Sequence, residues 1–448
     1  MRRAAAAAVL LAGAALAAPV RANPADTFGL GSRSTALGGA VSADVHDFSA
    51  GYYNPSGLAL AGGTDLSLGY MYVSHQLRLN GHDSQIDPVR GLMGGIVAPG
   101  SVAKIPFAFG IATHVPDERL SRARTVDPSV PVWMLYDNRS QLLYLTANLA
   151  IRPFKWLAVG GGMTFLAATK GSFDISGTAV LPDTLGKRSE YDSRLRHEVD
   201  ADLTAVRYPE FGVTILPSDR FSAALVYRGQ AELNLAIDAK LKGKVDAGLV
   251  TVPAQYALES QTLDAFIPRQ VVLGTSTQPV ERLRVNLDVV WVQWSAYKSP
   301  VSYSVTSLDV PLPKSLLPPA TKPSARTAPG FLDRFVPRVG VEYRFEPLQK
   351  LELPVRAGYA FERSPVPDQT GTTNFADTDR HILSLGTGVV LDHPGAVLPG
   401  NLRFDVDAQL SILPTRVTLK DSPADFTGDY HAGGTILAGG ATLSVGFK

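Results

Sequence analysis

The stretch NLRFDVDAQLSI, from Asn401 to Ile412, alternates apolar and polar residues without a break. Its even positions carry Leu, Phe, Val, Ala, Leu and Ile, whereas its odd positions carry Asn, Arg, Asp, Gln and Ser. A period of two over this length predicts a β-strand with one apolar and one polar face. The same alternation recurs at 282–291, 336–345 and 441–447, so the chain is predicted to be all-β.

Alternation alone fits two architectures. A soluble β-sandwich turns its apolar face inward, whereas a membrane β-barrel turns it toward lipid. Strand length favours the barrel, because runs of roughly ten to twelve residues can cross a bilayer at a tilt, whereas strands of soluble proteins average about five or six. Connector length favours it too, since short links such as 152–156, 216–220 and 277–282 alternate with long polar links such as 170–202 and 229–267.

Aromatic residues gather near the ends of the predicted strands. Such residues favour the two interfaces of a membrane, where they form girdles around a barrel. The residues predicted to form these girdles are Trp133, Tyr136, Phe154, Trp156, Trp294, Tyr297, Phe345 and Phe361.

The strands between the connectors number fourteen, and an even number is what closed bacterial barrels require. Their predicted boundaries are 64–79, 89–98, 104–115, 140–152, 156–169, 203–216, 220–229, 268–277, 282–295, 335–346, 354–363, 380–391, 401–413 and 436–447. Residues 64–448 are therefore expected to form one 14-stranded antiparallel transmembrane β-barrel.

Residues 1–22 have the features of a cleaved signal peptide. Arg2 and Arg3 precede the apolar run Ala4–Ala18, and Val20 and Ala22 occupy the small-residue positions of a cleavage site. The run is shorter than the roughly 20 residues that a membrane-spanning helix needs. The chain has no cysteine, which excludes disulfide bonds and a lipid-anchored N-terminal cysteine. A barrel exported in this way is expected in the bacterial outer membrane.

Residues 23–63 precede the first predicted strand and are rich in Gly, Ala and Ser. Fourteen strands enclose a lumen too wide for side chains alone to fill. The segment also keeps hydrophobic residues that a free tail would not need: Phe28, Leu30, Leu37, Val41, Val45, Phe48 and Leu58. It is therefore predicted to fold as a hatch inside the lumen, with a rigid turn at Asn54-Pro55 because proline restricts both its own φ and the preceding residue.

Three stretches resemble the FadL/TodX-type family of outer-membrane transporters of long-chain fatty acids and hydrocarbons. Residues 29–59 resemble the hatch of that family, with Gly38, Gly39, Asn54 and Pro55 at the positions of its GGA and NPAG patterns. The other two stretches are 266–297, which ends in a W-x-x-W-S pattern, and 355–389, which contains S-P-V-P-D and D-x-D-R.

The resemblance implies passive import of a hydrophobic molecule, with a long-chain fatty acid as the expected substrate and aromatic hydrocarbons as the alternative. Substrate would be caught among the long loops, would pass to an apolar pocket, and would leave sideways into the membrane once the hatch rearranges. The resemblance also places a bend in the third strand, where Gly110 is the candidate because a glycine in a strand often marks a bend. Gly38, Gly39, Asn54 and Pro55 are the candidate gating residues of the hatch.

The candidate substrate-binding residues lie in the hatch, in the third strand and in the loop that follows it. They are Phe28, Arg33, Phe107, Phe109, Trp133, Met134 and Leu135. The alternative role of Arg33 is an ion pair with the barrel wall, and that of the apolar residues is contact with the membrane interface. Charged residues expected to face the lumen, chiefly as ion pairs, are Arg284, Asp288, Arg338, Glu342, Arg344, Arg403, Asp405 and Asp407.

Other functions find less support in the sequence. The 42 basic and 41 acidic residues are nearly balanced, which argues against nucleic-acid binding. The chain lacks a G-x-S-x-G nucleophile elbow, so no enzyme is predicted. No metal or cofactor is expected, because Asp44, His46 and Asp47 have no second group of ligands nearby in the sequence. A structural or adhesion barrel with partner-binding loops is the alternative from another class. The expected partners are the hydrophobic substrate, outer-membrane lipid and lipopolysaccharide, and the protein is expected to be a monomer.

Overall fold

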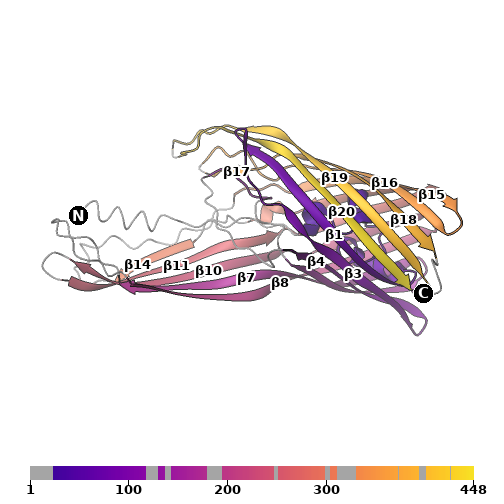
Figure 1. Cartoon of the computed structure of the whole chain (residues 1–448), viewed down its shortest axis with the longest axis horizontal. Helices are drawn as coiled ribbons and strands as arrows, with labels where there is room; N and C mark the ends of the chain where they lie inside the picture. Colours follow the sequence, from indigo (N-terminus) through magenta and orange to yellow (C-terminus); the bar gives the residue numbers. More distant parts are fainter. Residues whose placement is uncertain are drawn as a thin grey trace.

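In the computed structural model the chain forms a closed barrel of antiparallel strands with its N-terminal segment inside (Figure 1). The structure describes residues 24–117, 130–136, 143–178, 194–246, 251–297, 303–309, 329–371, 373–392, 400–423 and 425–447. The predicted signal peptide and Asn23 lie outside the described residues.

Fourteen strands make up the barrel, as the sequence predicts. They are β1 (Thr64–Leu79), β3 (Val89–Val102), β4 (Ile105–Pro116), β6 (Tyr144–Phe154), β7 (Leu157–Thr178), β8 (Arg194–Ser218), β9 (Phe221–Arg228), β12 (Gln270–Val280), β13 (Leu283–Val292), β15 (Arg334–Leu348), β16 (Leu351–Glu362), β18 (Arg380–Asp392), β19 (Asn401–Thr418) and β20 (Tyr430–Phe447). Each pairs with the next, and β1 closes the ring by pairing with both β20 and β3.

The polarity of the wall is that of a membrane barrel. In β19, Phe404 is 46% exposed on the outer face, whereas its neighbour Asp405 is 2% exposed inside. Leu66 and Leu68 of β1 are likewise exposed, and Ser67 between them is buried. Apolar residues on the outside and satisfied polar residues on the inside are what a lipid solvent requires.

Two of the predicted long links are strands. Within 170–202, β7 and β8 continue as a paired ribbon beyond the barrel. Within 229–267, β10 (Ala231–Asp246) and β11 (Thr251–Ile267) pair, and β14 (Tyr303–Asp309) joins β11. Figure 1 shows these strands extending away from the barrel, with β10 beside β7. The sequence prediction treats these segments as loops, although 231–241 reads AELNLAIDAKL with a clear period of two.

The predicted aromatic girdle is only half correct. At the end of the barrel with short turns, Phe154 and Trp156 are exposed and stack with their ring centres 5.5 Å apart. At the opposite end, which carries the long loops, the residues assigned to the girdle are buried inside the barrel mouth: Trp133, Tyr136, Trp294 and Tyr297. The prediction fails there because the loops fold back over the lumen.

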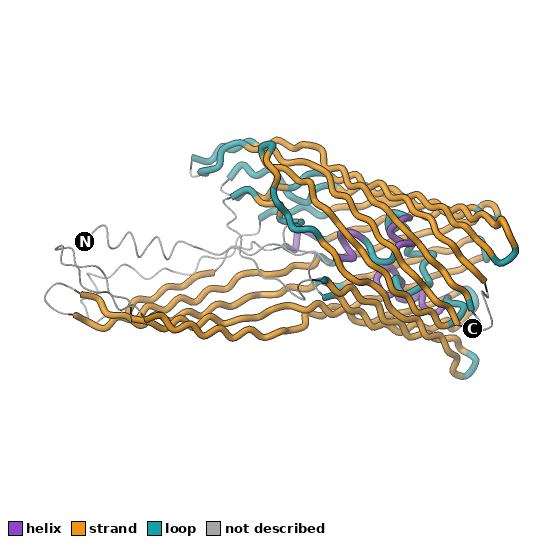
Figure 2. Tube along the Cα trace, in the orientation of Figure 1, coloured by secondary structure: helices purple, strands orange, loops and turns teal. Residues whose placement is uncertain are grey.

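Short elements fill the lumen and its mouth (Figure 2). The hatch contains α2 (Pro24–Phe28), α3 (Ser32–Ala36), α4 (Ala50–Tyr53) and η1 (Pro55–Leu60), and the mouth contains β2 (His82–Asp83), β5 (Val132–Trp133), η2 (Trp294–Ala296) and β17 (Phe375–Ala376). None of the helices in the described part of the chain is long and apolar enough to span a membrane.

Candidate functional site

The hatch rests directly on the barrel wall where the wall has glycine. A Cβ atom added to Gly160 would lie 2.5 Å from the carbonyl carbon of Pro55, and one added to Gly110 would lie 2.6 Å from Cδ2 of Leu58. A Cβ atom at Gly358 would overlap the backbone nitrogen of Gly38. Larger residues at these positions would hold the hatch away from the wall, so the glycines on β4, β7 and β16 form part of its seat.

Buried ion pairs fasten the centre of the hatch to the wall. Arg33 contacts Asp44 of the hatch at 2.5 Å and Glu342 of β15 at 3.2 Å. Glu342 also accepts from Arg356 at 2.6 Å and from Arg344 at 2.9 Å. The guanidinium of Arg33 is thus held by carboxylates on both sides, as the ion-pair alternative from the sequence describes.

A second set of ion pairs extends the network across the lumen. Arg356 contacts Asp405 at 2.7 Å, and Arg403 lies 3.4 Å from Asp47 of the hatch. Burial alone would raise the pKa of Asp47, but the positive charge of Arg403 and the hydrogen bonds from Ser49 hold that pKa below its usual value. Asp47 is therefore charged at neutral pH, and its charge helps to seat the hatch.

The candidate gating residues of the hatch lie in two tight segments. Gly38 and Gly39 follow α3 with φ values of 65° and 72°, in the left-handed region that favours glycine. Asn54 caps η1 through its side-chain oxygen, which accepts from the backbone nitrogen of Ser56. Its side-chain nitrogen donates to the Ser42 carbonyl at 2.6 Å and to Thr214 of β8 at 2.8 Å. Asn54 thus ties two parts of the hatch to the wall.

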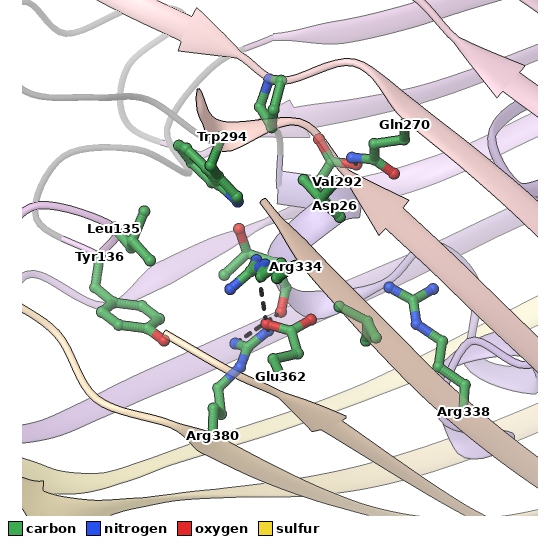
Figure 3. Close-up of a pocket in the computed structure, with 13 residues that line it drawn as sticks. Asp26, Leu135, Tyr136, Gln270, Val292, Trp294, Arg334, Arg338, Glu362 and Arg380 are labelled. Carbon is green, nitrogen blue, oxygen red and sulfur yellow. Dashed lines mark hydrogen bonds and ion pairs between the residues drawn. The ribbon is translucent and has the colours of Figure 1, made fainter. Parts of the chain in front are cut away.

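A cavity lies between the hatch and the loops at the barrel mouth, and we call it the entrance cavity (Figure 3). Its volume is about 40 Å³. The lining residues are Asp26, Thr27, Leu135, Tyr136, Pro268, Gln270, Val292, Trp294, Arg334, Val336, Arg338, Glu362 and Arg380. The N-terminal helix α2, the loop segment with Leu135 and the ends of five wall strands (β12, β13, β15, β16 and β18) therefore meet at this point.

Three arginines surround one glutamate in this cavity. Glu362 contacts Arg380 at 2.7 Å and Arg334 at 3.5 Å, as the dashed lines of Figure 3 show. Among the described residues no carboxylate lies within ion-pair distance of Arg338, which donates instead to the carbonyl oxygen of Gly39 at 3.5 Å. The only other carboxylate lining the cavity, Asp26, accepts from Tyr52 and Gln270. The cavity therefore carries an excess of positive charge.

Five aromatic side chains form a cluster that reaches the cavity through Trp294, and we call them the aromatic cap. They are Phe266, Trp294, Tyr297, Phe331 and Phe375, with neighbouring ring centres between 4.8 and 6.2 Å apart. All five are buried. An apolar cluster beside a cationic cavity suits a molecule with a hydrocarbon part and an anionic end.

Comparison with known proteins identifies the family to which this barrel belongs. Residues 8–443 match the family model described as outer membrane protein transport protein (OMPP1/FadL/TodX). The chain belongs to this family. It is therefore a passive outer-membrane channel for hydrophobic small molecules, and not an enzyme. The resemblance seen in the sequence is confirmed over nearly the whole chain.

Individual proteins are similar to this chain in sequence or in fold. Alkane uptake protein A of Marinobacter nauticus is 23% identical, with 98% of this chain and 96% of that protein covered. A FadL homologue of Pseudomonas aeruginosa has a similar fold, with a TM-score of 0.54, 15% identity, and 96% and 98% of the two chains covered. The toluene transporter TodX of Pseudomonas putida gives a TM-score of 0.53 at 14% identity, with 96% and 100% covered.

The structure places the predicted substrate-binding residues of this FadL/TodX-family chain at four separate locations. Leu135 lines the entrance cavity, and Trp133 packs beside it against Tyr136. Phe28 lies at the end of α2 with its ring against His75 of β1 at 5.7 Å. Arg33 lies in the ion-pair network and not at the cavity.

Phe107 and Phe109 lie elsewhere. Both are at outward-facing positions of β4, and Phe109 is 40% exposed. This placement fits contact with lipid, the alternative from the sequence, and not a groove for capturing substrate. The cause is the alternation of side chains along β4. The two phenylalanines share the outer face with Ile111, whereas Ala108 and Gly110 face the hatch.

Gly110 has a different environment from the one predicted. β4 pairs with β3 and β6 without a register shift at this residue, where Gly110 lies opposite Val97 on one side and Asn148 on the other. The predicted bend is thus not accompanied by a break in pairing. Gly110 instead gives space to Leu58 of the hatch. Its role in gating stays a prediction.

Of the residues that line the cavity, only Leu135 is among the binding candidates from the sequence, and the charged group Arg334, Glu362 and Arg380 is not. Arg380 belongs to the D-x-D-R pattern of 355–389, so a signal for it was present. Glu362 and Arg380 carry no local signal that they meet. They are opposite each other in the register of β16 and β18, which only the strand pairing reveals.

Proposed function

We propose that the protein imports long-chain fatty acids across the outer membrane, with the carboxylate held at the entrance cavity and the chain packed against apolar residues. The observation that supports this substrate is the excess of guanidinium groups around Glu362. Arginine binds carboxylates through paired hydrogen bonds. Arg338, which has no carboxylate partner among the described residues, is the proposed first contact of the acid.

The cavity must grow to hold such a molecule. Its volume of about 40 Å³ is small beside the roughly 300–1,000 Å³ of ordinary ligand pockets. The apolar lining from Leu135, Val292, Trp294 and Val336 marks the side on which the hydrocarbon tail would lie. We therefore infer that the loop segment with Leu135, or the hatch helix α2, moves as substrate enters.

The proposed exit is sideways into the membrane after the hatch rearranges. β3, β4 and β6 are continuously paired around Gly110, and Leu58 fills the space that this glycine leaves. Displacement of Leu58 would uncover the wall at Gly110 from within, and a sideways exit there would also require the pairing of β4 with β3 or β6 to open. This supports Gly110 and the hatch residues Gly38, Gly39, Asn54 and Pro55 as proposed gating positions.

An uncharged hydrocarbon is the second candidate substrate. The aromatic cap offers apolar and ring-stacking contacts without any need for a carboxylate. The relatives named for alkane uptake and toluene transport point in the same direction. The choice between the two classes depends on whether the arginines contribute to uptake.

Uptake by cells separates these possibilities. Cells that express the protein are given radiolabelled hexadecanoate, hexadecane or toluene, and uptake is compared with cells that lack it. The variant Arg338→Gln should lower hexadecanoate uptake about tenfold, since a hydrogen bond to a charged group is worth roughly 1.5–3 kcal/mol. Hydrocarbon uptake should not fall, because a hydrocarbon has no carboxylate for Arg338 to bind.

The matched control is Arg344→Gln. Arg344 lies on the same strand, β15, and contacts Glu342, which pairs with Arg33 of the hatch, but Arg344 does not line the cavity. Equal loss of hexadecanoate uptake in both variants would show that Arg338 has no special role. Uptake of hydrocarbons alone would replace the fatty acid as the substrate.

A further inference from the structure

A second cavity lies on the hatch side of the entrance cavity, and we call it the hatch cavity. Its volume is about 30 Å³, and hatch residues from Ala25 to Gly29, together with Gly38 and Gly39, form much of its lining. Arg338, Glu362 and Arg380 line both cavities, as do Asp26 and Thr27 of α2. The three wall residues, which we call the arginine layer, therefore form the boundary between the cavities together with α2.

The arginine layer also holds the hatch, and it does so through backbone carbonyl groups. Arg380 donates to the carbonyl oxygen of Thr27 at 3.2 Å. Arg338 donates to that of Gly39 at 3.5 Å. Both acceptors are neutral, although both donors are charged and buried or nearly so. The Nε atom of Arg380 has no hydrogen-bond partner among the described residues, so a donor is left over.

Arg380 reaches the loop as well as the hatch. Its guanidinium carbon lies 5.9 Å from the centre of the Tyr136 ring. Tyr136 in turn packs against Trp133 and His75. One side chain thus contacts the wall through Glu362, the hatch through Thr27 and the mouth loop through Tyr136. Any ligand that draws Arg380 into the entrance cavity acts on all three.

We propose that the arginine layer is a ligand-exchange latch. The carboxylate of an arriving substrate takes over hydrogen bonds that Arg380 and Arg338 give to the carbonyls of Thr27 and Gly39. This exchange frees α2 and joins the two cavities. The latch rests on the proposed function, because it assumes a substrate with a carboxylate.

The exchange is favourable because a carboxylate is a stronger acceptor than a peptide carbonyl and can take two hydrogen bonds from one guanidinium. A ligand shifts such an equilibrium only if it interacts differently with the two states. A long-chain alcohol fills the same space but cannot compete for the charged donors. The latch therefore discriminates between an acid and an alcohol at the step of hatch release, and not only at binding.

Cysteine labelling tests the latch directly, because the chain has no cysteine of its own. Ala25→Cys places a thiol on α2, where the native side chain is 4% exposed. Ala59→Cys places one in η1 at the other end of the hatch. The purified full-length protein in nanodiscs is exposed to a polar maleimide with hexadecanoate, with hexadecanol or with no addition.

Hexadecanoate should raise the labelling rate of Ala25→Cys by about tenfold or more, since each hydrogen bond from a charged donor is worth a factor of this order. Hexadecanol should leave the rate nearly unchanged. The rate at Ala59→Cys should respond to neither, because the latch frees α2 and not the whole hatch.

The variant Arg380→Lys provides a second test of the latch. Lysine keeps the charge but, as a compact ammonium, does not offer the planar set of donors that reaches Glu362 and Thr27 together. In this background Ala25→Cys should label faster without any ligand, and hexadecanoate should add little. The control is Arg416→Lys, because Arg416 donates to loop carbonyls of Val366 and Asp377 and not to the hatch.

The outcomes separate the latch from the proposed function. If calorimetry shows hexadecanoate binding while labelling at Ala25→Cys stays constant, the latch is wrong and the substrate stands. Equal acceleration by acid and alcohol also rejects the latch, since charge is then not the trigger. If hexadecanoate does not bind, the proposed substrate is wrong, and unchanged basal labelling in Arg380→Lys would show that Arg380 does not hold α2 either.

Discussion

Glu342 shows how much a single buried residue does in this barrel. It accepts from Arg33 of the hatch and from Arg356 and Arg344 of the wall, and it is 1% exposed. Loss of one charge from such a network leaves several guanidinium groups without their partner. The cost falls on the docking of the hatch, because Arg33 is the only one of these arginines that the hatch contributes.

We predict that Glu342→Gln destabilises hatch docking by about 3–5 kcal/mol, the usual cost of breaking a buried ion pair from one side. The expected result is frequent leak currents of the purified protein in planar bilayers. Glu346→Gln on the same strand is the control, because its pair with Arg282 is about half exposed and such pairs contribute under about 1 kcal/mol. Quiet recordings from Glu342→Gln would contradict the prediction.

Gly358 is the basis of a second prediction about a single residue. Gly358→Ala adds a methyl group where the backbone of Gly38 lies, so the hatch must shift at a cost of about 1–3 kcal/mol. Cells that carry this variant should become more sensitive to vancomycin, a large polar antibiotic. Gly439→Ala on β20 should have no effect, because only the Asp407 carbonyl oxygen lies within 4 Å of its added carbon.

Some of these residue contacts could be predicted from the sequence and others could not. The inward orientation of Arg338, Glu342 and Arg403 follows from alternation, which puts charged residues on the inner face of the wall. Which charges meet depends on strand register, and alternation says nothing about register. The Glu362–Arg380 contact therefore emerges only from the folded barrel.

At the scale of elements, alternation located the barrel strands well because lipid imposes a strict outward apolar pattern on them. β1 begins and ends at the predicted residues, Thr64 and Leu79. Outside the barrel wall that constraint ends, so the sequence does not distinguish the strands β10, β11 and β14 from loops. It does not predict the fold of the mouth for a similar reason, since residues 133–136 have no periodic pattern.

The pairing of β5 with β17 holds the mouth loop, residues 130–136, in place. Phe375 and Ala376 lie opposite Val132 and Trp133, and the backbone nitrogen of Val132 donates to the Asn374 carbonyl at 3.2 Å. Val132→Pro removes this donor, so the loop should open and expose Trp133. Val132→Ala keeps the donor and is the matched control.

Acrylamide quenching of tryptophan fluorescence measures this opening. The chain has four tryptophans, and subtraction of spectra from proteins that also carry Trp133→Phe isolates the signal of Trp133. Stronger quenching in Val132→Pro than in Val132→Ala is expected. Equal quenching in the two variants would mean that side-chain packing, and not the backbone pairing, keeps the loop closed.

At the scale of the whole molecule, the barrel and the hatch make separate contributions to stability. The ring is closed by hydrogen bonds from β1 to β20 and β3, and the apolar side chains of its outer face contact lipid. Neither depends on the hatch. Removal of residues 24–62 should therefore leave a folded barrel, since water entering the lumen would solvate Glu342, Arg356 and Asp405.

Two measurements check this expectation. The shortened protein should keep the heat-dependent shift in gel mobility that marks a closed barrel, and it should conduct ions as a wide pore. A protein that migrates as unfolded chain before heating would show that the hatch is needed for the barrel to form. The full-length protein, with its lumen filled, provides the reference for both measurements.

The closure of β1 on β20 has a consequence for how the protein is made. The ring cannot close before the last strand of the chain is in place, yet the hatch comes first in synthesis and export. Its partners lie on strands spread around the whole ring, among them Gly160 on β7, Glu342 on β15 and Gly358 on β16. The hatch, although it is first in the chain, is thus the last segment to form its contacts. It has to stay unfolded until the strands have formed the lumen that it fills.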